Sequence, residues 1–285
     1  MLGIVGTVPS EDFPLVTGEI ALVDGMIRIK DKFVPVTRGT PALMAAAFII
    51  TEALEQPAPV AYLAGDIGRG KGSRTLYKYL VDHLSTTKLE TLTFHYLQPI
   101  VHWHNRLHAL LENMSNRPLL IADAGFMYVA KMSGHANMYD LFTPDVGELA
   151  FLADESAPHP FYTRGFILHD ENRVPELIAR AYDHNNSAQY MIVKGKKDYL
   201  ASRVGILATV DSPIEEALEA MGGTGDTLTG IVSALIDSGL SLENASVTAM
   251  KINRLAGLYA RPTPATQVIE IINHIPKALA EVFQL

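Results

Sequence analysis

Short apolar segments alternate with stretches of helical periodicity along most of the chain, and this alternation constrains the fold more than any other feature. Residues 60–65 (VAYLAG), 91–97 (TLTFHYL) and 189–195 (QYMIVKG) are three of these segments. Parallel strands are buried on both faces, because helices cover both sides of the sheet, and they therefore read as continuous apolar runs. The pattern predicts an α/β fold with a central, mostly parallel sheet.

The helical stretches are long enough to cover both faces of such a sheet. Thr40 is the expected N-cap of the first helix, with Pro41 at its first position. No repeat or long linker interrupts the pattern, so residues 1–285 are predicted to form a single domain. The other expected helices span residues 73–84, 105–114, 126–132, 147–153, 172–184, 225–238, 242–260 and 266–283.

Residues 15–38 are predicted to add an N-terminal β-hairpin to this domain. Its turn is Asp24-Gly25, a dipeptide that tolerates the positive φ angles of a type I′ turn. The register set by this turn places apolar residues on one face, with Ile20 opposite Ile29 and Leu22 opposite Ile27. That face needs cover, either from the main domain or from another subunit.

The charge balance and the residue content exclude several classes of protein. With 23 Lys and Arg against 31 Asp and Glu, and the basic residues scattered, nucleic acid is not an expected partner. The absence of cysteine excludes disulfides and thiolate catalysis. No apolar run is long enough to span a membrane, and the first residues lack the features of a secretory signal. We expect a cytoplasmic protein.

Two glycine-rich loops each precede a helix and are candidate phosphate sites. The first glycine loop, residues 65–73 (GDIGRGKGS), fits G-x-x-x-x-G-K, but Gly72 stands where Ser or Thr should bind Mg²⁺. A true P-loop centred on Lys71 is therefore the weaker hypothesis. Asp66 and Arg69 remain candidate substrate contacts, because the loop opens the N-terminus of a helix and cations flank it. The alternative is a tight turn whose basic side chains lie in solvent.

The second glycine loop, residues 222–226 (GGTGD), precedes the apolar helix TLTGIVSALI. Its glycines let backbone amides approach an anion closely, and the helix adds partial positive charge at this end. Asp226 lies in the first turn, where it either caps the helix or deprotonates a hydroxyl that attacks phosphorus. This loop is the stronger candidate.

The segment GGTGDTLTGIVSALI resembles the C-terminal signature of the ribokinase-like superfamily, most closely that of the ADP/ATP-dependent NAD(P)H-hydrate dehydratases. LLIADAGF, LFTPDVGELAFL and MIVKGKKDYLAS resemble further segments of that family in the same order, and the resemblance covers about residues 117 to 260. It implies a three-layer α/β/α sandwich that binds ATP or ADP with Mg²⁺. Relatives of this kind are often oligomeric, so a homo-oligomer is expected.

The resemblance also implies roles for individual residues. Asp226 would be the catalytic base, and Glu148 the residue that acts on Mg²⁺. Asp123 and Asp145 would lie near the small-molecule substrate, although Asp145 and Glu148 are also spaced D-x-x-E as in a helix cap. The phosphates and the nucleotide would contact Gly222, Gly223, Thr224, Gly225, Lys194 and Gly195.

The chain departs from the family on the expected acceptor side. Asp145 replaces a family histidine, and QPIVHWHNRLH replaces a glycine-rich turn after the strand at 91–97. The histidines of this region are a weak zinc hypothesis, since no H-E-x-x-H pattern or cysteine accompanies them. The sequence therefore predicts an ATP/ADP-dependent enzyme that phosphorylates a hydroxyl on a small-molecule acceptor. The resemblance implies dehydration of hydrated NAD(P)H by this route, and a small-molecule kinase is the alternative. A non-catalytic nucleotide-binding protein is the second alternative.

Overall fold

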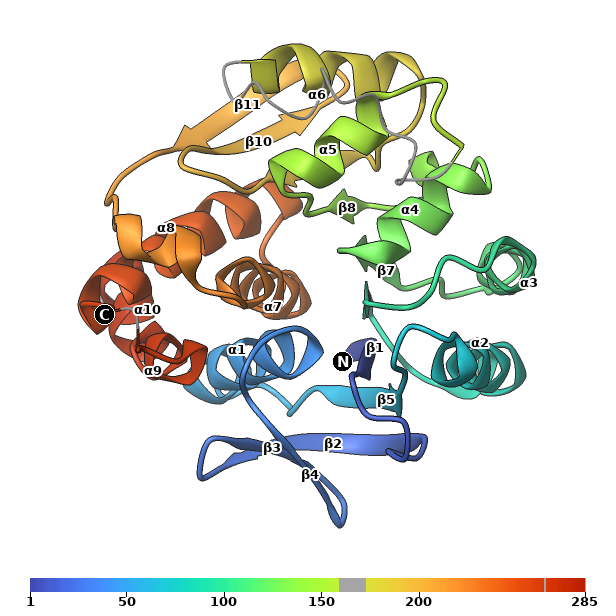
Figure 1. Cartoon of the computed structure of the whole chain (residues 1–285), viewed down its shortest axis with the longest axis horizontal. Helices are drawn as coiled ribbons and strands as arrows, with labels where there is room; N and C mark the ends of the chain where they lie inside the picture. Colours follow the sequence, from blue (N-terminus) through green and yellow to red (C-terminus); the bar gives the residue numbers. More distant parts are fainter. Residues whose placement is uncertain (159–172, 264, 285) are drawn as a thin grey trace.

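The computed structural model describes residues 1–158, 173–263 and 265–284. Across these residues one sheet contains eleven strands in the order β11-β10-β9-β8-β7-β6-β1-β5-β2-β3-β4 (Figure 1). The strands are β1 (Leu2–Val8), β2 (Val16–Val23), β3 (Met26–Ile29), β4 (Lys32–Pro35), β5 (Val60–Gly65), β6 (Thr91–His95), β7 (Leu119–Ala122), β8 (Leu141–Phe142), β9 (Tyr190–Val193), β10 (Asp198–Ser202) and β11 (Gly205–Val210).

The six central strands are parallel, and antiparallel strands extend the sheet at both ends. Strands β5, β1, β6, β7, β8 and β9 pair in parallel with their neighbours. Beyond them, β10 and β11 pair antiparallel at one end, and β2, β3 and β4 at the other. The prediction of a mixed α/β fold with a mostly parallel central sheet is confirmed.

Helices pack on both faces of this sheet and form two apolar cores (Figure 1). The first core involves α1 (Thr40–Ala53), α7 (Thr224–Asp237), α8 (Leu242–Ala260), α9 (Val268–Ile272) and α10 (Ile275–Phe283). The second involves α2 (Lys71–His83), α3 (Val101–Glu112), α4 (Gly125–Met132), α5 (Val146–Ala153) and α6 (Val174–Asp183). Within the described ranges, none of the helices combines the length and apolar character needed to cross a bilayer.

Several predicted helix boundaries are wrong by a few residues. The N-cap of α1 is Gly39 rather than Thr40, and α3 begins at Val101, four residues before the predicted 105. The expected helix 266–283 is broken into α9 and α10, and Pro276 stands in the first turn of α10. Residue 172, the predicted first residue of α6, lies outside the described residues.

Strand β1 lies in the centre of the sheet, between β5 and β6, and the sequence did not reveal it. Its side chains alternate between the two cores, so that Ile4 packs in one and Val5 in the other. Gly6 allows a close approach, because a Cβ atom there would come within 2.5 Å of the Thr40 side chain. The close packing brings the start of α1 to the carboxyl end of β1.

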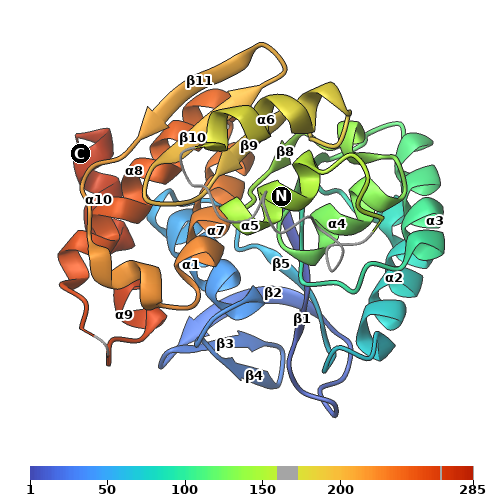
Figure 2. The same cartoon turned by 45° about the horizontal axis from the view of Figure 1, so that its top comes forward.

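The N-terminal hairpin has the predicted register, with Ile20 opposite Ile29 and Leu22 opposite Ile27. It continues into a third strand, β4, which was not predicted, and β2 joins it to the main sheet along β5 (Figure 2). The buried face of the hairpin packs into the same core as α1. The chain itself thus covers this face, and the face no longer argues for a subunit contact; the homo-oligomer stays a prediction.

Candidate active site

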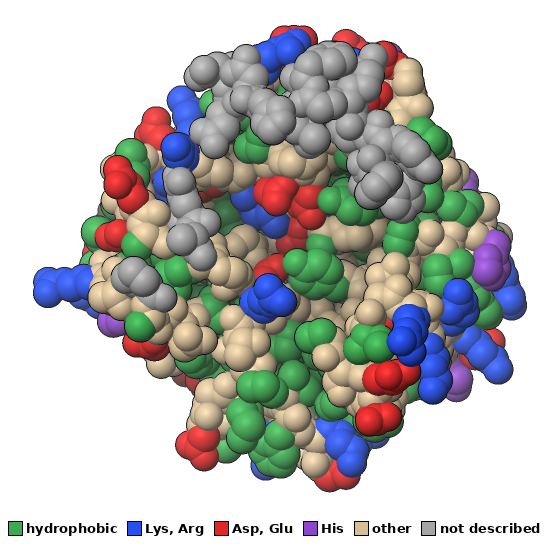
Figure 3. Space-filling view, viewed as in Figure 1, with side chains coloured by type: hydrophobic (Ala, Val, Ile, Leu, Met, Phe, Trp, Pro, Cys, Tyr) green, Lys and Arg blue, Asp and Glu red, His purple; other side chains and the backbone are tan. Residues whose placement is uncertain are grey.

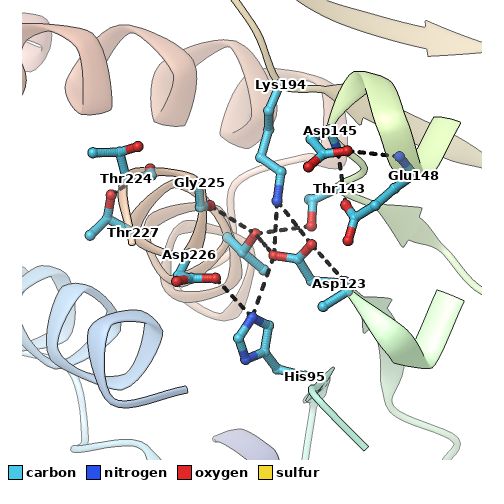
Figure 4. A network of polar contacts seen from close by, with 12 residues as sticks. His95, Asp123, Thr143, Asp145, Glu148, Lys194, Thr224, Gly225, Asp226 and Thr227 are labelled. Carbon is cyan, nitrogen blue, oxygen red and sulfur yellow. Dashed lines mark hydrogen bonds and ion pairs between the residues drawn. The ribbon is translucent and has the colours of Figure 1, made fainter. Parts of the chain in front are cut away.

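The carboxyl ends of three parallel strands meet the N-terminus of α7 at one edge of the sheet. His95 ends β6, Asp123 follows β7, and Lys194 follows β9 (Figure 4). A cavity of about 490 Å³ opens there, and Figure 3 shows acidic and basic side chains meeting in a hollow near the centre of this face. It is lined by most of the predicted site residues: Asp123, Asp145, Glu148, Lys194, Gly195, Gly223, Thr224, Gly225 and Asp226.

The second glycine loop forms the wall of this cavity at the start of α7. The N-cap Gly223 has a φ angle of 104°, a conformation that glycine adopts without strain. No side chain of the described residues caps this helix. The first amides of a helix have no partner within the helix, and the helix dipole makes this end partially positive. These amides therefore form a ready anion site that faces a cavity.

Asp226 turns away from these amides and is held from the opposite side. Its Oδ2 atom accepts a hydrogen bond of 2.6 Å from the Gly39 amide, and its Oδ1 atom lies 3.0 Å from His95 Nε2. Burial opposes ionisation, but the hydrogen bond from His95 and the charge of Lys194 outweigh it and lower the Asp226 pKa. The side chain keeps 13% exposure, so an ionised carboxylate reaches the cavity.

Lys194 forms a nearly buried ion pair with Asp123. Its Nζ atom lies 2.9 and 3.0 Å from the two carboxylate oxygens, and Thr229 also donates to Asp123 at 2.6 Å. Burial disfavours the charged ammonium, yet the carboxylates of Asp123 and Glu148 outweigh this effect and raise the Lys194 pKa. The ammonium also lies 3.5 Å from the position of a Cβ atom on Gly225. A positive charge thus stands beside the amides of α7.

Asp145 and Glu148 form the capping box of α5, as their spacing allowed. The Asp145 Oδ1 atom accepts from the Glu148 amide at 2.7 Å, and Glu148 Oε2 accepts from the Asp145 amide at 2.9 Å. Each carboxylate keeps a second oxygen without a hydrogen bond to the described residues. Burial raises the pKa of Glu148 to about 8, against the opposing charge of Lys194. Oxygen donors beside an anion site fit Mg²⁺.

The first glycine loop is filled by its own aspartate. Asp66 accepts hydrogen bonds from the amides of Gly68, Gly70 and Ser73 at 2.9 to 3.1 Å. The Ser73 hydroxyl adds a fourth bond at 2.8 Å. The amides that a P-loop would offer to phosphate already bind a carboxylate, which argues against that hypothesis.

The polar groups of Arg69 and Asp66 already have partners within the protein. The Arg69 side chain is 73% exposed, lines neither cavity described here, and pairs with Glu11 at 3.2 Å. Asp66 lines a second cavity, but its oxygens are already bonded within the loop. The prediction that these two residues contact substrate loses its support.

This second cavity, of about 610 Å³, lies between the hairpin and the carboxyl end of β1. Tyr96 lines both cavities, and Gly39, which binds Asp226, lines the second one. Asp226 therefore stands where the two cavities approach each other. Aromatic and polar side chains from the hairpin and neighbouring loops surround the space, among them Phe13, Phe33, Arg38 and Gln98.

Comparison with known proteins is consistent with this geometry. Residues 102–277 match the Carb_kinase family, described as NAD(P)H-hydrate dehydratase. The match covers more than half of the chain. The chain belongs to the NAD(P)H-hydrate dehydratase family. Membership identifies it as an enzyme of this type, and the likeness expected from the second glycine loop is confirmed.

Three proteins illustrate the relationship. The uncharacterised protein MJ1337 of Methanocaldococcus jannaschii is 45% identical over 216 residues, which cover 75% of this chain and 88% of MJ1337. The ADP/ATP-dependent NAD(P)H-hydrate dehydratase of Bacillus subtilis has a TM-score of 0.53 at 12% identity, covering 99% of this chain and 91% of that one. Pyridoxal kinase of Staphylococcus aureus has a TM-score of 0.55 at 12% identity, covering 89% and 86%. The two structures establish the ribokinase-like fold.

The family match begins after the two residues that form hydrogen bonds to the Asp226 carboxylate. Gly39 and His95 both precede residue 102, as do the hairpin and most residues of the second cavity. The second glycine loop, Lys194 and Glu148 fall within the match. The part of the chain shared with the dehydratase family thus carries the anion site, and the part outside the match carries the second cavity.

Sequence reasoning missed the role of His95 and Tyr96. His95 was weighed as a zinc ligand and as a surface or pocket-lining imidazole, and its position at the carboxyl end of a parallel strand could have placed it in the site. Tyr96 has a positive φ angle of 50°, which is rare for an aromatic residue and is common at functional sites. Its pKa is raised to about 12, mainly by burial.

The structure gives the histidines roles other than zinc binding. His104 and His108 share a face of α3, as an early helix start requires, but His104 bonds to Tyr139 and Ser133 at 2.8 and 2.9 Å. Among the described residues, His95, Asp123 and Asp226 bring possible ligand atoms within 4.8 Å of one another. The Lys194 ammonium already supplies a cation to Asp123, so we assign no metal to this group.

Proposed function

We propose that this enzyme transfers a phosphoryl group from ATP or ADP to a hydroxyl on a small molecule, in the manner of an NAD(P)H-hydrate dehydratase. One observation carries the proposal: the N-terminus of α7 lacks a side-chain cap among the described residues and faces a cavity beside an ionised Asp226. A helix that needed only a cap would use its aspartate on its own amides. Here the aspartate points elsewhere, and the amides are left for an anion.

The nucleotide phosphates lie against Gly223, Thr224 and Gly225, and Gly222 supports the turn. Lys194 and Gly195 flank the nucleotide from the opposite wall of the cavity. The dehydratase of Bacillus subtilis was co-crystallised with ATP and Mg²⁺, which supports a nucleotide here. The free oxygens of Glu148 and Asp145 would hold Mg²⁺, which would supply positive charge to offset that of the phosphates.

Asp226 acts as the general base. The acceptor hydroxyl donates its proton to the Asp226 carboxylate as its oxygen attacks the terminal phosphorus, and the bond to the leaving nucleotide oxygen breaks. The products are a phosphate ester and a nucleotide shortened by one phosphate. An ionised base is present at neutral pH because the Asp226 pKa is lowered. Asp123 holds Lys194 in place and contacts the substrate side of the site.

With hydrated NADH or NADPH as acceptor, elimination of the phosphate ester restores the reduced nicotinamide ring. A small-molecule kinase that releases the ester is the second candidate, and the second cavity favours it. That cavity is lined on the hairpin side by Gly39, whose amide bonds to Asp226, and is built from residues outside the family match. A hydroxyl bound there would approach the same base that the nucleotide reaches from the first cavity.

A direct assay separates these functions. The protein is incubated with Mg·ATP or Mg·ADP and hydrated NADH, and the absorbance near 340 nm is followed together with nucleotide consumption. Recovered absorbance supports the dehydratase, and consumption without recovery, in the presence of another alcohol, supports the kinase. A protein that binds nucleotide but turns over none, either as wild type or as Asp226→Asn, would contradict both and indicate a non-catalytic nucleotide-binding protein.

A further inference from the structure

His95 connects the proposed base to the start of α1. The side chain is fully buried, with its Nε2 atom 3.0 Å from Asp226 Oδ1 and its Nδ1 atom 3.0 Å from the Thr40 hydroxyl. Thr40 is itself fully buried and is packed closely against Gly6. The three side chains therefore form a chain of hydrogen bonds beneath the cavity, two of them contributed from outside the family match.

The chemistry of the partners fixes the proton on His95. An ionised carboxylate only accepts hydrogen bonds, so the Nε2 atom must carry a proton in order to bind Asp226. The Nδ1 atom lies 3.0 Å from the Thr40 hydroxyl, which can donate to this nitrogen or accept from it. Thr40 makes no other side-chain hydrogen bond to the described residues. The Asp226 carboxylate thus requires the N–H group on Nε2, and the buried Thr40 hydroxyl holds the other side of the ring.

We propose that His95 is the positioning residue of Asp226, and that the Thr40–His95 pair keeps the base ionised and aimed at the acceptor hydroxyl. The inference deepens the proposed function and rests on it. His95 does not receive the transferred proton, because its Nε2 position already carries one. Its part is to hold one carboxylate oxygen, while the Gly39 amide holds the other.

Other groups also face Asp226, and they limit what His95 contributes. The Lys194 ammonium stabilises the carboxylate from the β9 side, while Asp123, 3.9 Å from His95 Nε2, and Tyr96 lie on the β7 and β6 sides. Most of the Lys194 charge is already engaged by Asp123. Loss of the His95 donor should therefore raise the Asp226 pKa, although the Gly39 amide remains.

Two conservative variants separate the donor from simple packing. A glutamine side chain can place an N–H group near the position of Nε2, so His95→Gln retains a donor to Asp226. An asparagine side chain reaches only the position of Nδ1, so His95→Asn retains a partner for Thr40 and loses the donor. Both variants are polar and uncharged. If His95 had only a structural role, the two variants would not differ in the Asp226 pKa.

The first measurement is a carboxyl ¹³C NMR titration of Asp226 in the full chain, with its signal assigned by its loss in Asp226→Asn. We expect the midpoint to rise by about one pH unit or more in His95→Asn and to stay near the wild-type value in His95→Gln. Equal midpoints in wild type and His95→Asn, with both variants folded by circular dichroism, would overturn the inference. Nucleotide and acceptor play no part in this readout.

The second measurement is ATP turnover against pH, with hydrated NADH or the alcohol found in the assay above. In His95→Asn the acidic limb should move upward with the Asp226 midpoint, and kcat should fall about tenfold to a hundredfold with the KM for ATP unchanged. His95→Gln should recover most of the rate. If Mg·ATP does not bind at all, the proposed function fails, and the titration still decides the role of His95.

Discussion

The two glycine loops look alike in sequence and differ in what their amides bind. Each precedes a helix, and each places a glycine with positive φ at the N-cap, Gly70 in the first loop and Gly223 in the second. In the first loop the amides bind the Asp66 carboxylate. In the second loop the aspartate bonds to Gly39 and His95 instead, and the amides face a cavity.

The difference depends on where the aspartate stands relative to the glycines. Asp66 precedes Gly68 and Gly70 within its loop, so its side chain can fold back onto amides two, four and seven residues later. Asp226 follows the glycines of its loop, inside the first turn of α7, and its side chain projects toward β6 and α1. One carboxylate therefore closes its loop, and the other is free to serve as a base beside an open one.

Removing the proposed base, Asp226, should change the rate of phosphoryl transfer more than any other substitution. Asp226→Asn should lower phosphoryl transfer about a thousandfold, because the amide cannot accept the hydroxyl proton. Binding of Mg·ADP should persist, since the α7 amides and Lys194 remain. ADP release measures the loss of phosphoryl transfer, and thermal stabilisation by Mg·ADP measures the retained binding. Unchanged turnover in the variant would remove Asp226 from the reaction.

Removing the internal carboxylate of the first loop should affect stability and not nucleotide binding. Asp66→Ala leaves the amides of Gly68, Gly70 and Ser73 without their acceptor and should cost about 2 kcal/mol of unfolding free energy. Urea denaturation measures the loss, and Asp82→Ala, at an exposed site on α2, is the control. A weakened affinity for Mg·ADP without a loss of stability would contradict the comparison.

The same carboxylate should show its effect in the pH dependence of stability. Burial opposes ionisation of Asp66, but hydrogen bonds from Ser73, Gly70 and Gly68 outweigh it and lower the pKa. Its contribution is therefore complete above the unfolded value of 3.8 and is lost as the pH falls through the lower folded value. The difference in stability between wild type and Asp66→Ala should shrink over that range.

The affinity for Mg²⁺ should increase with pH in the cavity that Glu148 and the second loop line. Burial raises the pKa of Glu148 to about 8, so the carboxylate is mostly protonated at pH 7 and mostly ionised at pH 9. If Mg²⁺ binds the ionised form, its apparent affinity in the presence of ADP should rise about tenfold over this interval. Magnesium titrations at both pH values measure it, and Glu148→Gln should abolish the rise.

The smallest effect is expected at the lysine that suggested a P-loop. Lys71→Ala should change the affinity for Mg·ADP by less than about twofold, because Lys71 is exposed at the start of α2, beside a loop already filled by Asp66. Gly223→Ala is the matched variant in the second loop. Its φ angle of 104° and the Val268 contact at 3.0 Å make a side chain there disruptive. If Lys71→Ala lost affinity for Mg·ADP and Gly223→Ala did not, the first loop rather than the second would be the nucleotide site.

Local patterns in the sequence were sufficient for much of the fold, and they marked the residues of the candidate anion site, which stays a prediction. The hairpin register followed from Asp24-Gly25, and the apolar segments marked most of the parallel strands. Strand β1 was missed because Gly3 and Gly6 weaken its apolar pattern, and their purpose, close packing against other elements, is visible only in three dimensions.

The contacts that distinguish the two loops are of two kinds. Asp66 binds amides within its own loop, and an aspartate followed by glycines at the second and fourth positions is a local signal that could have been read. Asp226 binds residues 131 and 187 positions away. No local pattern reports such a contact, which depends on how β6 and α1 meet in the folded chain.

The central claim is that the amides of the second glycine loop, and not those of the first, bind the nucleotide phosphates. It is tested most directly by ¹H–¹⁵N NMR of the full chain during a titration with Mg·ADP. We predict that the amide signals of Gly223, Thr224 and Gly225 shift strongly, while those of Gly68 and Gly70 stay in place. Large shifts at Gly68 and Gly70, with Gly225 unmoved, would contradict the account.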